Sequence, residues 1–144
     1  MANVPLIQNP SSGFSMRSVS PTATIITGNF RVWNNWTNGQ ILNDGYNINS
    51  NFDTSNGRYT APVSGRYLVT MTLKNSTSNR RRIGHILFSN NTYTEFVESY
   101  DEFADIGNST VIQLTAGQWI QFGDHNGASL GAEEILASVY FLGV

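Results

Sequence analysis

Residues 47–73 read NINSNFDTSNGRYTAPVSGRYLVTMTL and combine two kinds of local signal. Asp53–Gly57 is rich in residues that tolerate the left-handed backbone region, so it predicts a tight turn. Pro62 fixes its own φ and favours extended geometry at the preceding residue, and Ser64-Gly65 predicts a second turn. In the segment that follows, Tyr67, Val69, Met71 and Leu73 alternate with Arg66, Thr70, Thr72 and Lys74, which predicts a strand buried on one face. The stretch is therefore a series of turns that leads into a core strand.

The rest of the chain repeats this alternation of extended segments and turns. Further strands are predicted, in chain order, at 22–26, 29–34, 58–60, 82–88, 110–114, 118–122 and 137–144. Residues 93–100 fit either a strand followed by a loop, which we favour because the surroundings are β, or an apolar helical face. The Asn38-Gly39 pair predicts a type I′ hairpin between Trp36 and Ile41. Closely spaced strands with turns rich in Gly and Asn predict an all-β sandwich.

The final segment, Ala137–Val144, is apolar on both faces. Val139 and Phe141 point to one side of the predicted strand, while Tyr140 and Leu142 point to the other. A strand that is apolar on both faces is buried on both, so its second face predicts contact with another subunit. The candidates for this contact are Tyr140, Leu142 and Trp119.

Composition limits the classes of function. Charged residues make up 12% of the 144 residues, roughly half the usual share, and the net charge is -2. This balance gives no general attraction for nucleic acid or for anionic membranes. The chain has no cysteine, so it has neither disulfides nor thiolate metal ligands. No apolar run reaches the length of a membrane-spanning helix.

Residues 1–21 are typical of an extended arm that precedes a domain of residues 22–144. Three of the four prolines lie in this arm, between Asn, Ser and Gly residues. It lacks the basic flank and the long apolar core of a secretory signal. Its candidate anchor residues, toward a partner or a neighbouring subunit, are Leu6, Ile7 and Phe14. We accordingly expect the protein to be made in a cytoplasm or carried in a particle assembled there.

Three segments resemble the complement-1q/tumour-necrosis-factor-like globular domain, especially its bacterial and phage relatives. The most specific is FDTSNGRYTAPVSGRY at 52–67, with an aromatic residue and Asp, a turn ending in Gly, then Thr-Ala-Pro and Gly-x-Tyr. VIQLTAGQWIQF at 111–122 is similar to a later strand pair of the family, and SVYFLGV at 138–144 to its closing strand. The resemblance covers roughly residues 30–144. It implies a jelly roll of two antiparallel sheets, normally a homotrimer, that serves recognition and not catalysis.

No set of residues predicts catalysis. Residues 127–131, GASLG, match the nucleophile-elbow pattern, but that motif needs a strand-turn-helix and a later His, and no His follows Ser129. His85 and His125 are the only histidines, and neither has a carboxylate or a second His at metal-ligand spacing. We therefore expect no enzymatic activity and no cofactor, with Ca²⁺ at an acidic cluster as the alternative.

Three groups are candidates for ligand binding. Trp36 lies beside the Asn38-Gly39 turn, where an exposed ring can stack on a sugar; packing inside the sandwich or the trimer is the alternative. Arg80 and Arg81, followed by Arg82, can grip a phosphate, a sulfate or an acidic sugar, or pair with acidic residues of the same or another subunit. An acidic cluster offers oxygen ligands for Ca²⁺, or else a solvated surface. Its members are Glu95, Glu98, Asp101, Glu102 and Asp105.

These expectations combine into one function. We expect a non-enzymatic trimer that presents a binding surface on a virion, as a capsid decoration, head-fibre or tail-fibre protein, with the arm as its anchor to a capsid or tail protein. The reasons are that the chain is little more than the domain, lacks an export signal and carries a proline-rich apolar arm. The alternative is a carbohydrate-binding module for adhesion to cell-surface glycan outside any particle. We expect neither nucleic acid binding nor membrane insertion.

Overall fold

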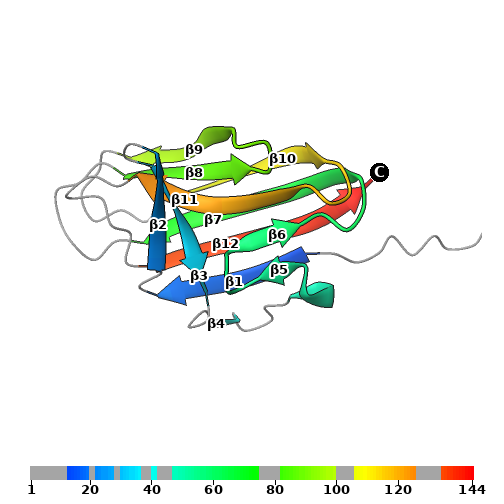
Figure 1. The fold of residues 1–144 in the computed structure, drawn as a ribbon, viewed down its shortest axis with the longest axis horizontal. Coiled ribbons are helices and arrows are strands. Elements are labelled where there is room, and N and C mark those ends of the chain that lie inside the picture. The colour runs from blue at the N-terminus through cyan, green and yellow to red at the C-terminus, as the bar shows by residue number, and fades with distance from the viewer. Residues whose placement is uncertain are drawn as a thin grey trace, which may run out of the picture.

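The computed structural model describes residues 13–19, 22–27, 30–36, 40–41, 47–74, 82–99, 106–125 and 134–144. These residues form twelve β-strands and one 3-10 helix, with no α-helix among them (Figure 1). The elements are β1 (Gly13–Val19), β2 (Thr22–Thr27), β3 (Phe30–Asn35), β4 (Gln40–Ile41), η1 (Ile48–Ser50), β5 (Phe52–Asp53), β6 (Arg58–Thr60), β7 (Gly65–Lys74), β8 (Arg82–Phe88), β9 (Tyr93–Ser99), β10 (Ile106–Leu114), β11 (Trp119–His125) and β12 (Glu134–Gly143). Within these ranges, no helix has the length and apolar character needed to cross a membrane.

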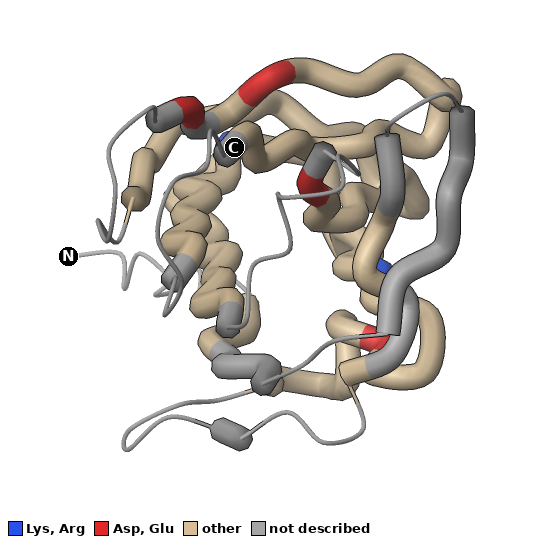
Figure 2. Tube along the Cα trace, turned by 90° about the vertical axis from the view of Figure 1, so that its left-hand side faces the viewer, with Lys and Arg blue, Asp and Glu red and all other residues tan. Residues whose placement is uncertain are grey.

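The strands build two sheets, in which every pair is antiparallel. The first sheet has five strands in the order β10-β7-β12-β1-β4. The second has seven, with β11 at its centre. Strand β8 pairs with residues 120–124 along one edge of β11. The other edge is shared by β6, which pairs with residues 119–121, and β3, which pairs with residues 123–125. Figure 2, turned by 90° from Figure 1, shows two layers of strands. Charged residues occupy only short segments of the described trace.

The turn before β6 is fixed by its own side chains and backbone. The Gly57 N–H donates to the Asp53 carbonyl at 2.7 Å, and Gly57 has φ +71, a value that favours glycine. The Asp53 carboxylate accepts from the Ser55 hydroxyl and N–H and from the Asn56 amide. These bonds, the one from the Ser55 hydroxyl first, hold the pKa of Asp53 below its usual value. The turn predicted at Asp53–Gly57 is therefore confirmed.

Strand β7 supplies one wall of the core. Its inward side chains, Tyr67, Val69, Met71 and Leu73, are all buried, as the period-two pattern predicts. The Tyr67 hydroxyl donates to the Val63 carbonyl at 2.6 Å, and burial raises the pKa of this phenol. The Tyr67 ring thus fills the core while its polar hydroxyl group is hydrogen-bonded.

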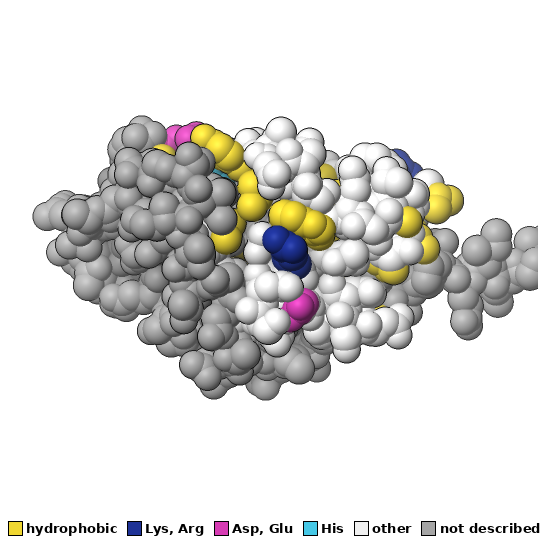
Figure 3. Space-filling view, viewed as in Figure 1, with side chains coloured by type: hydrophobic (Ala, Val, Ile, Leu, Met, Phe, Trp, Pro, Cys, Tyr) yellow, Lys and Arg dark blue, Asp and Glu magenta, His cyan; other side chains and the backbone are white. Residues whose placement is uncertain are grey.

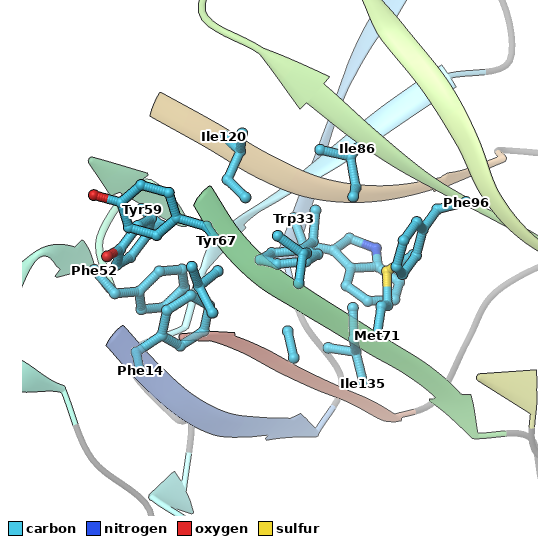
Figure 4. Packing of buried hydrophobic residues seen from close by; sticks show 14 of the residues in the cluster. Phe14, Trp33, Phe52, Tyr59, Tyr67, Met71, Ile86, Phe96, Ile120 and Ile135 are labelled. Carbon is cyan, nitrogen blue, oxygen red and sulfur yellow. The ribbon is translucent and has the colours of Figure 1, made fainter. Parts of the chain in front are cut away.

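Aromatic side chains from both sheets fill the space between them. Phe14 of β1 stacks on Phe52 of β5, with ring centroids 3.9 Å apart and an interplanar angle of 13°. Figure 4 shows these rings and Tyr59 on one side of the core, with Trp33 and Met71 further along. The indole N–H of Trp33 donates to the buried Asp124 carboxylate at 3.1 Å, which fixes the ring in place. The core therefore runs the length of the sandwich.

Strand pairing tests two further predictions, the strand at residues 93–100 and the hairpin between Trp36 and Ile41. Residues 93–99 form strand β9, so the strand that we favoured over a helix is confirmed. The hairpin predicted between Trp36 and Ile41 is wrong. Strand β3 pairs with β2 and β11 in the second sheet, whereas β4 pairs with β1 in the first. The chain passes from one sheet to the other at this point, and residues 37–39 lie outside the described part.

The predicted arm of residues 1–21 is wrong for Gly13–Val19. These residues form β1, which lies between β12 and β4 in the first sheet. Phe14 is fully buried in the core and is therefore no free anchor residue. The physical reason is that burying this ring and pairing the open edge of β12 stabilise the segment as part of the domain. Leu6 and Ile7 lie outside the described residues, so their role as anchors stays a prediction.

Replacing Phe14 with alanine tests whether β1 belongs to the domain. We expect Phe14→Ala to lower the free energy of unfolding by about 3–5 kcal/mol, because it leaves a cavity beside Phe52. Urea unfolding followed by tryptophan fluorescence, at one protein concentration, measures the change. The control is Ser15→Ala, on the same strand and facing the opposite side, which should change stability by about 0.5 kcal/mol or less. If Phe14→Ala lowered the free energy of unfolding as little as Ser15→Ala does, residues 13–19 would belong to an arm and not to the domain.

Candidate functional site

The outer face of the first sheet carries an apolar row that crosses three strands. Leu68 of β7 is paired with Val111 of β10 on one side and with Tyr140 of β12 on the other. Directly paired residues point to the same face of a sheet. Their neighbours in the chain, Tyr67 and Val139, point into the core, so this row points outward. We define the outer apolar row as Val111, Leu68, Tyr140 and Leu142.

The side chains of this row are largely uncovered in the single chain. Tyr140 is 53% exposed, Val111 51% and Leu142 46%, while Val139 and Phe141, the chain neighbours of Tyr140, are buried. The two-sided character predicted for the closing strand is therefore confirmed for a single chain: one face is in the core and the other is open. Exposure of an apolar row of this kind to water is unfavourable, which makes this face the candidate association surface.

A row of hydroxyl groups runs beside the outer apolar row, two residues further along the strands. It consists of Ser109, Thr70, Ser138 and Ser15, which are paired in register across β10, β7, β12 and β1. The hydroxyl groups of Thr70 and Ser138 are hydrogen-bonded to each other. Neither row contains a charged side chain, so the two rows can meet identical rows without like-charge repulsion, while the exposed Arg66 lies on the same face beyond the outer apolar row.

Trp119 does not join the outer apolar row. It lies on β11, in the second sheet, where it packs against Val32 and Leu87. The guanidinium carbon of Arg58 lies 4.0 Å from the centroid of its ring, a cation–π contact. Figure 3 views the molecule with β6 and β11 in front and shows apolar side chains beside a basic and an acidic one on a largely uncharged surface. The structure thus separates Trp119 from Tyr140 and Leu142, which lie on the other sheet.

Trp36 is a core residue, and its predicted role as a sugar-stacking platform is wrong. Its ring is fully buried, and its indole N–H donates to the Trp33 carbonyl at 3.0 Å. The edge of one ring meets the face of the other between Trp36 and Phe52, with centroids 5.2 Å apart and planes at 90°. The alternative, packing inside the sandwich, is correct. The reason is that the chain crosses between the sheets directly after this residue, which leaves its ring between them.

The titratable candidates lie on β8 and β9 of the second sheet, where His85 is paired with Glu95, or outside the described residues. His85 is buried on β8, and its ring meets that of Tyr93 edge-on, with centroids 5.7 Å apart. Glu95 and Glu98 are exposed on β9. Among the described residues, no group of three or more His, Cys, Asp or Glu side chains is placed to hold a metal ion. The candidates outside the described residues are Arg80, Arg81, Asp101, Glu102, Asp105 and residues 127–131.

The fold and the exposed face define a jelly-roll binding domain of two antiparallel sheets. The family model described as the C1q domain matches residues 41–143, which is more than half of the chain. The chain therefore belongs to the C1q domain family, as the resemblance implied. Domains of the C1q and tumour-necrosis-factor type are non-enzymatic binding modules that typically form homotrimers. A search of curated proteins by sequence finds no match.

Solved structures agree with this fold. The globular domain of zebrafish complement 1qA has a TM-score of 0.59 and 13% identity, over 91% of this chain and 95% of that one. Murine APRIL at pH 5.0 has a TM-score of 0.64 and 11% identity, over 92% and 99% of the two chains. Murine APRIL at pH 8.0 has a TM-score of 0.61 and 9% identity, over 91% and 100%. At these identities the likeness shows the fold alone.

Replacing Gly57 with alanine tests the packing of Trp36. A Cβ at this position would lie 2.1 Å from the Trp33 carbonyl oxygen and 2.8 Å from the Trp36 indole nitrogen. We expect Gly57→Ala to lower the free energy of unfolding by clearly more than about 1–2 kcal/mol, which is the cost of a left-handed backbone alone. Urea unfolding measures the difference.

Gly117 offers a matched control for this substitution. It has φ +85, and a Cβ there would meet nothing within 4 Å. Gly117→Ala therefore reports the backbone cost without the contact. Equal losses for Gly57→Ala and Gly117→Ala would contradict the close packing against Trp33 and Trp36, whereas failure of Gly57→Ala alone to fold would agree with it.

Proposed function

We propose that this protein is a non-enzymatic recognition module that works as a homotrimer, with the outer apolar row buried between subunits. The observation that carries the proposal is the exposure of Val111, Tyr140 and Leu142 on one outer face. Three adjacent strands present apolar side chains to water there, and two of them, β7 and β12, also bury their inner faces in the core. Covering the row with the same surface of a second subunit would remove this apolar area from water.

The chemistry of the face suits contact between identical chains. The outer apolar row supplies surface that gains from burial, and the adjoining hydroxyl row supplies groups that both donate and accept hydrogen bonds. Hydroxyl groups can therefore pair with copies of themselves, which charged groups of one sign cannot. Family membership supports the trimer, because domains of this type typically form homotrimers.

Introducing a charge into the row tests the trimer. We expect the unchanged protein to be a trimer at micromolar concentration, and Tyr140→Glu to be a folded monomer, because the interface would bury an unpaired carboxylate. Size exclusion coupled to light scattering measures the mass, and circular dichroism checks the fold. Tyr93→Glu is the matched control, since Tyr93 is 51% exposed but lies on β9 of the second sheet. A monomeric unchanged protein, or a trimeric Tyr140→Glu, would contradict the proposal.

We further propose that the trimer is a component of a virion, as a decoration or fibre protein, and that residues 1–12 anchor it. Two observations support this placement. One is the resemblance at 52–67, which we expect to be strongest to bacterial and phage members of the family, and the other is that Leu6 and Ile7 stand among prolines and polar residues. Because β1 begins at Gly13, the candidate anchor is shorter than the 21 residues that the sequence predicts.

Changing only residues 6–9 tests the anchor. We expect Leu6→Asp with Ile7→Asp to abolish incorporation into purified particles while leaving thermal stability and oligomeric state unchanged. Mass spectrometry of the particles measures incorporation. Gln8→Asp with Asn9→Asp adds the same charge without removing apolar side chains, and should still be incorporated. Particles that never contain the unchanged protein would refute the virion role, and equal incorporation of both double variants would refute the anchor.

A further inference from the structure

A pocket of about 270 Å³ lies at the end of the sandwich where the β8–β9 turn faces the β10–β11 turn. Neither turn belongs to the outer apolar row or to the core. The polar side chains that line the pocket are Ser89, Asn90, Thr92, Gln113 and Gln118, and its apolar wall is formed by Phe88 and Leu114. Every one of these residues is uncharged. The pocket is therefore a neutral, polar site beside one aromatic ring.

Backbone hydrogen bonds hold the two turns in place. In the β8–β9 turn the Phe88 N–H donates to the Thr92 carbonyl at 2.8 Å, and the Ser89 N–H donates to the Trp119 carbonyl at 3.0 Å. In the β10–β11 turn the Gln118 N–H donates to the Thr115 carbonyl at 2.9 Å. A site whose walls are already fixed loses little conformational entropy when a ligand binds.

Some polar atoms of the pocket are used within the protein and others remain available. The Asn90 Oδ1 accepts from both the N–H and the hydroxyl of Thr92, and the Gln118 Oε1 accepts from the Thr115 N–H. These bonds orient the two amides and leave the Nδ2 of Asn90 and the Nε2 of Gln118 as donors. Within the described part of the chain, no hydrogen bond engages the side-chain amide of Gln113.

The chemistry of the lining selects a class of ligand. Amide and hydroxyl groups both donate and accept hydrogen bonds, which matches a ligand that carries several hydroxyl groups. No lining residue carries a charge that would compensate the desolvation of a charged ligand, although Arg66 is paired with Gln113 on the neighbouring strand. A volume of about 270 Å³ lies just below the usual range of small-molecule sites, which begins at about 300 Å³, so it suits one sugar ring and not a long chain.

We infer that this pocket binds a neutral saccharide unit, with one face of the sugar against Phe88 and its hydroxyl groups bonded to Asn90, Gln113 and Gln118. The inference gives the proposed recognition module a ligand class and rests on that module role, although not on the trimer or the virion. It also moves carbohydrate binding away from Trp36, which is buried in the core.

Saturation-transfer NMR on the full chain tests the inference. The probes are glucose, galactose, mannose and N-acetylglucosamine at millimolar concentration, with N-acetylneuraminic acid and inorganic phosphate as charged comparisons. We expect binding of at least one neutral sugar and of neither charged probe. Gln113→Leu, which keeps the size of the side chain but removes its hydrogen bonds, should weaken that binding about three- to tenfold.

Thr110→Ala is the matched control, because Thr110 is exposed on the same strand as Gln113 but belongs neither to the pocket nor to the two rows on the outer face. It should bind the sugar as the unchanged protein does. Absence of binding by all four neutral sugars, preference for a charged probe, or equal binding by Gln113→Leu would overturn the inference. A protein that is trimeric but binds no sugar would overturn the pocket alone, whereas a monomer that binds sugar would overturn the trimer alone.

Discussion

The close approach of the chain at Gly57 is the constraint on which the rest of the sandwich depends. Only a residue without a Cβ lets the Asp53–Gly57 turn lie against the Trp33 carbonyl and the Trp36 indole. With the turn in that place, Phe52 before it makes an edge-to-face contact with Trp36 and stacks on Phe14. Four aromatic rings from three separate parts of the chain thus share one core. Because Trp33 and Phe52 belong to the second sheet and Phe14 to the first, this contact joins the two layers.

The strands and turns that could be predicted from the sequence are those that a short run of neighbouring residues determines. Residues 58–60 and 82–88 are strands at the predicted bounds, and Tyr67 to Leu73 alternate as predicted, since burial on one face imposes a period of two on the residues themselves. The Asp53–Gly57 turn was equally visible, because it needs particular residue types at neighbouring positions. For the candidate site, the same periodicity identified Tyr140 and Leu142 as the outward side of the closing strand.

The failures share a different cause, which is contact between residues far apart in the chain. The Asn38-Gly39 signal favours a hairpin, but β4 pairs with β1, and no local pattern around Gln40 specifies that partner. Phe14 stands in a segment rich in Pro, Ser and Asn, and only its distant partner Phe52 makes it a core residue. The pocket escaped sequence reasoning for the same reason: its polar residues come from two turns, and each turn alone is unremarkable.

The two outer faces show how one chain treats apolar side chains that cannot reach the core. On the second sheet, Trp119 is covered from within the same chain, by Val32 and Leu87 beside it and by the Arg58 guanidinium over its ring. On the first sheet, Tyr140 and its row lie among hydroxyl groups too short to cover them. If the two outer faces served the same purpose, neighbouring side chains would be expected to cover the apolar residues of both sheets to the same extent. Among the described residues, Tyr93 is exposed on the second sheet, whereas Val111, Tyr140 and Leu142 are exposed together on the first. This gathering of apolar side chains on one face is the physical argument for proposing the first sheet as the surface that meets another subunit.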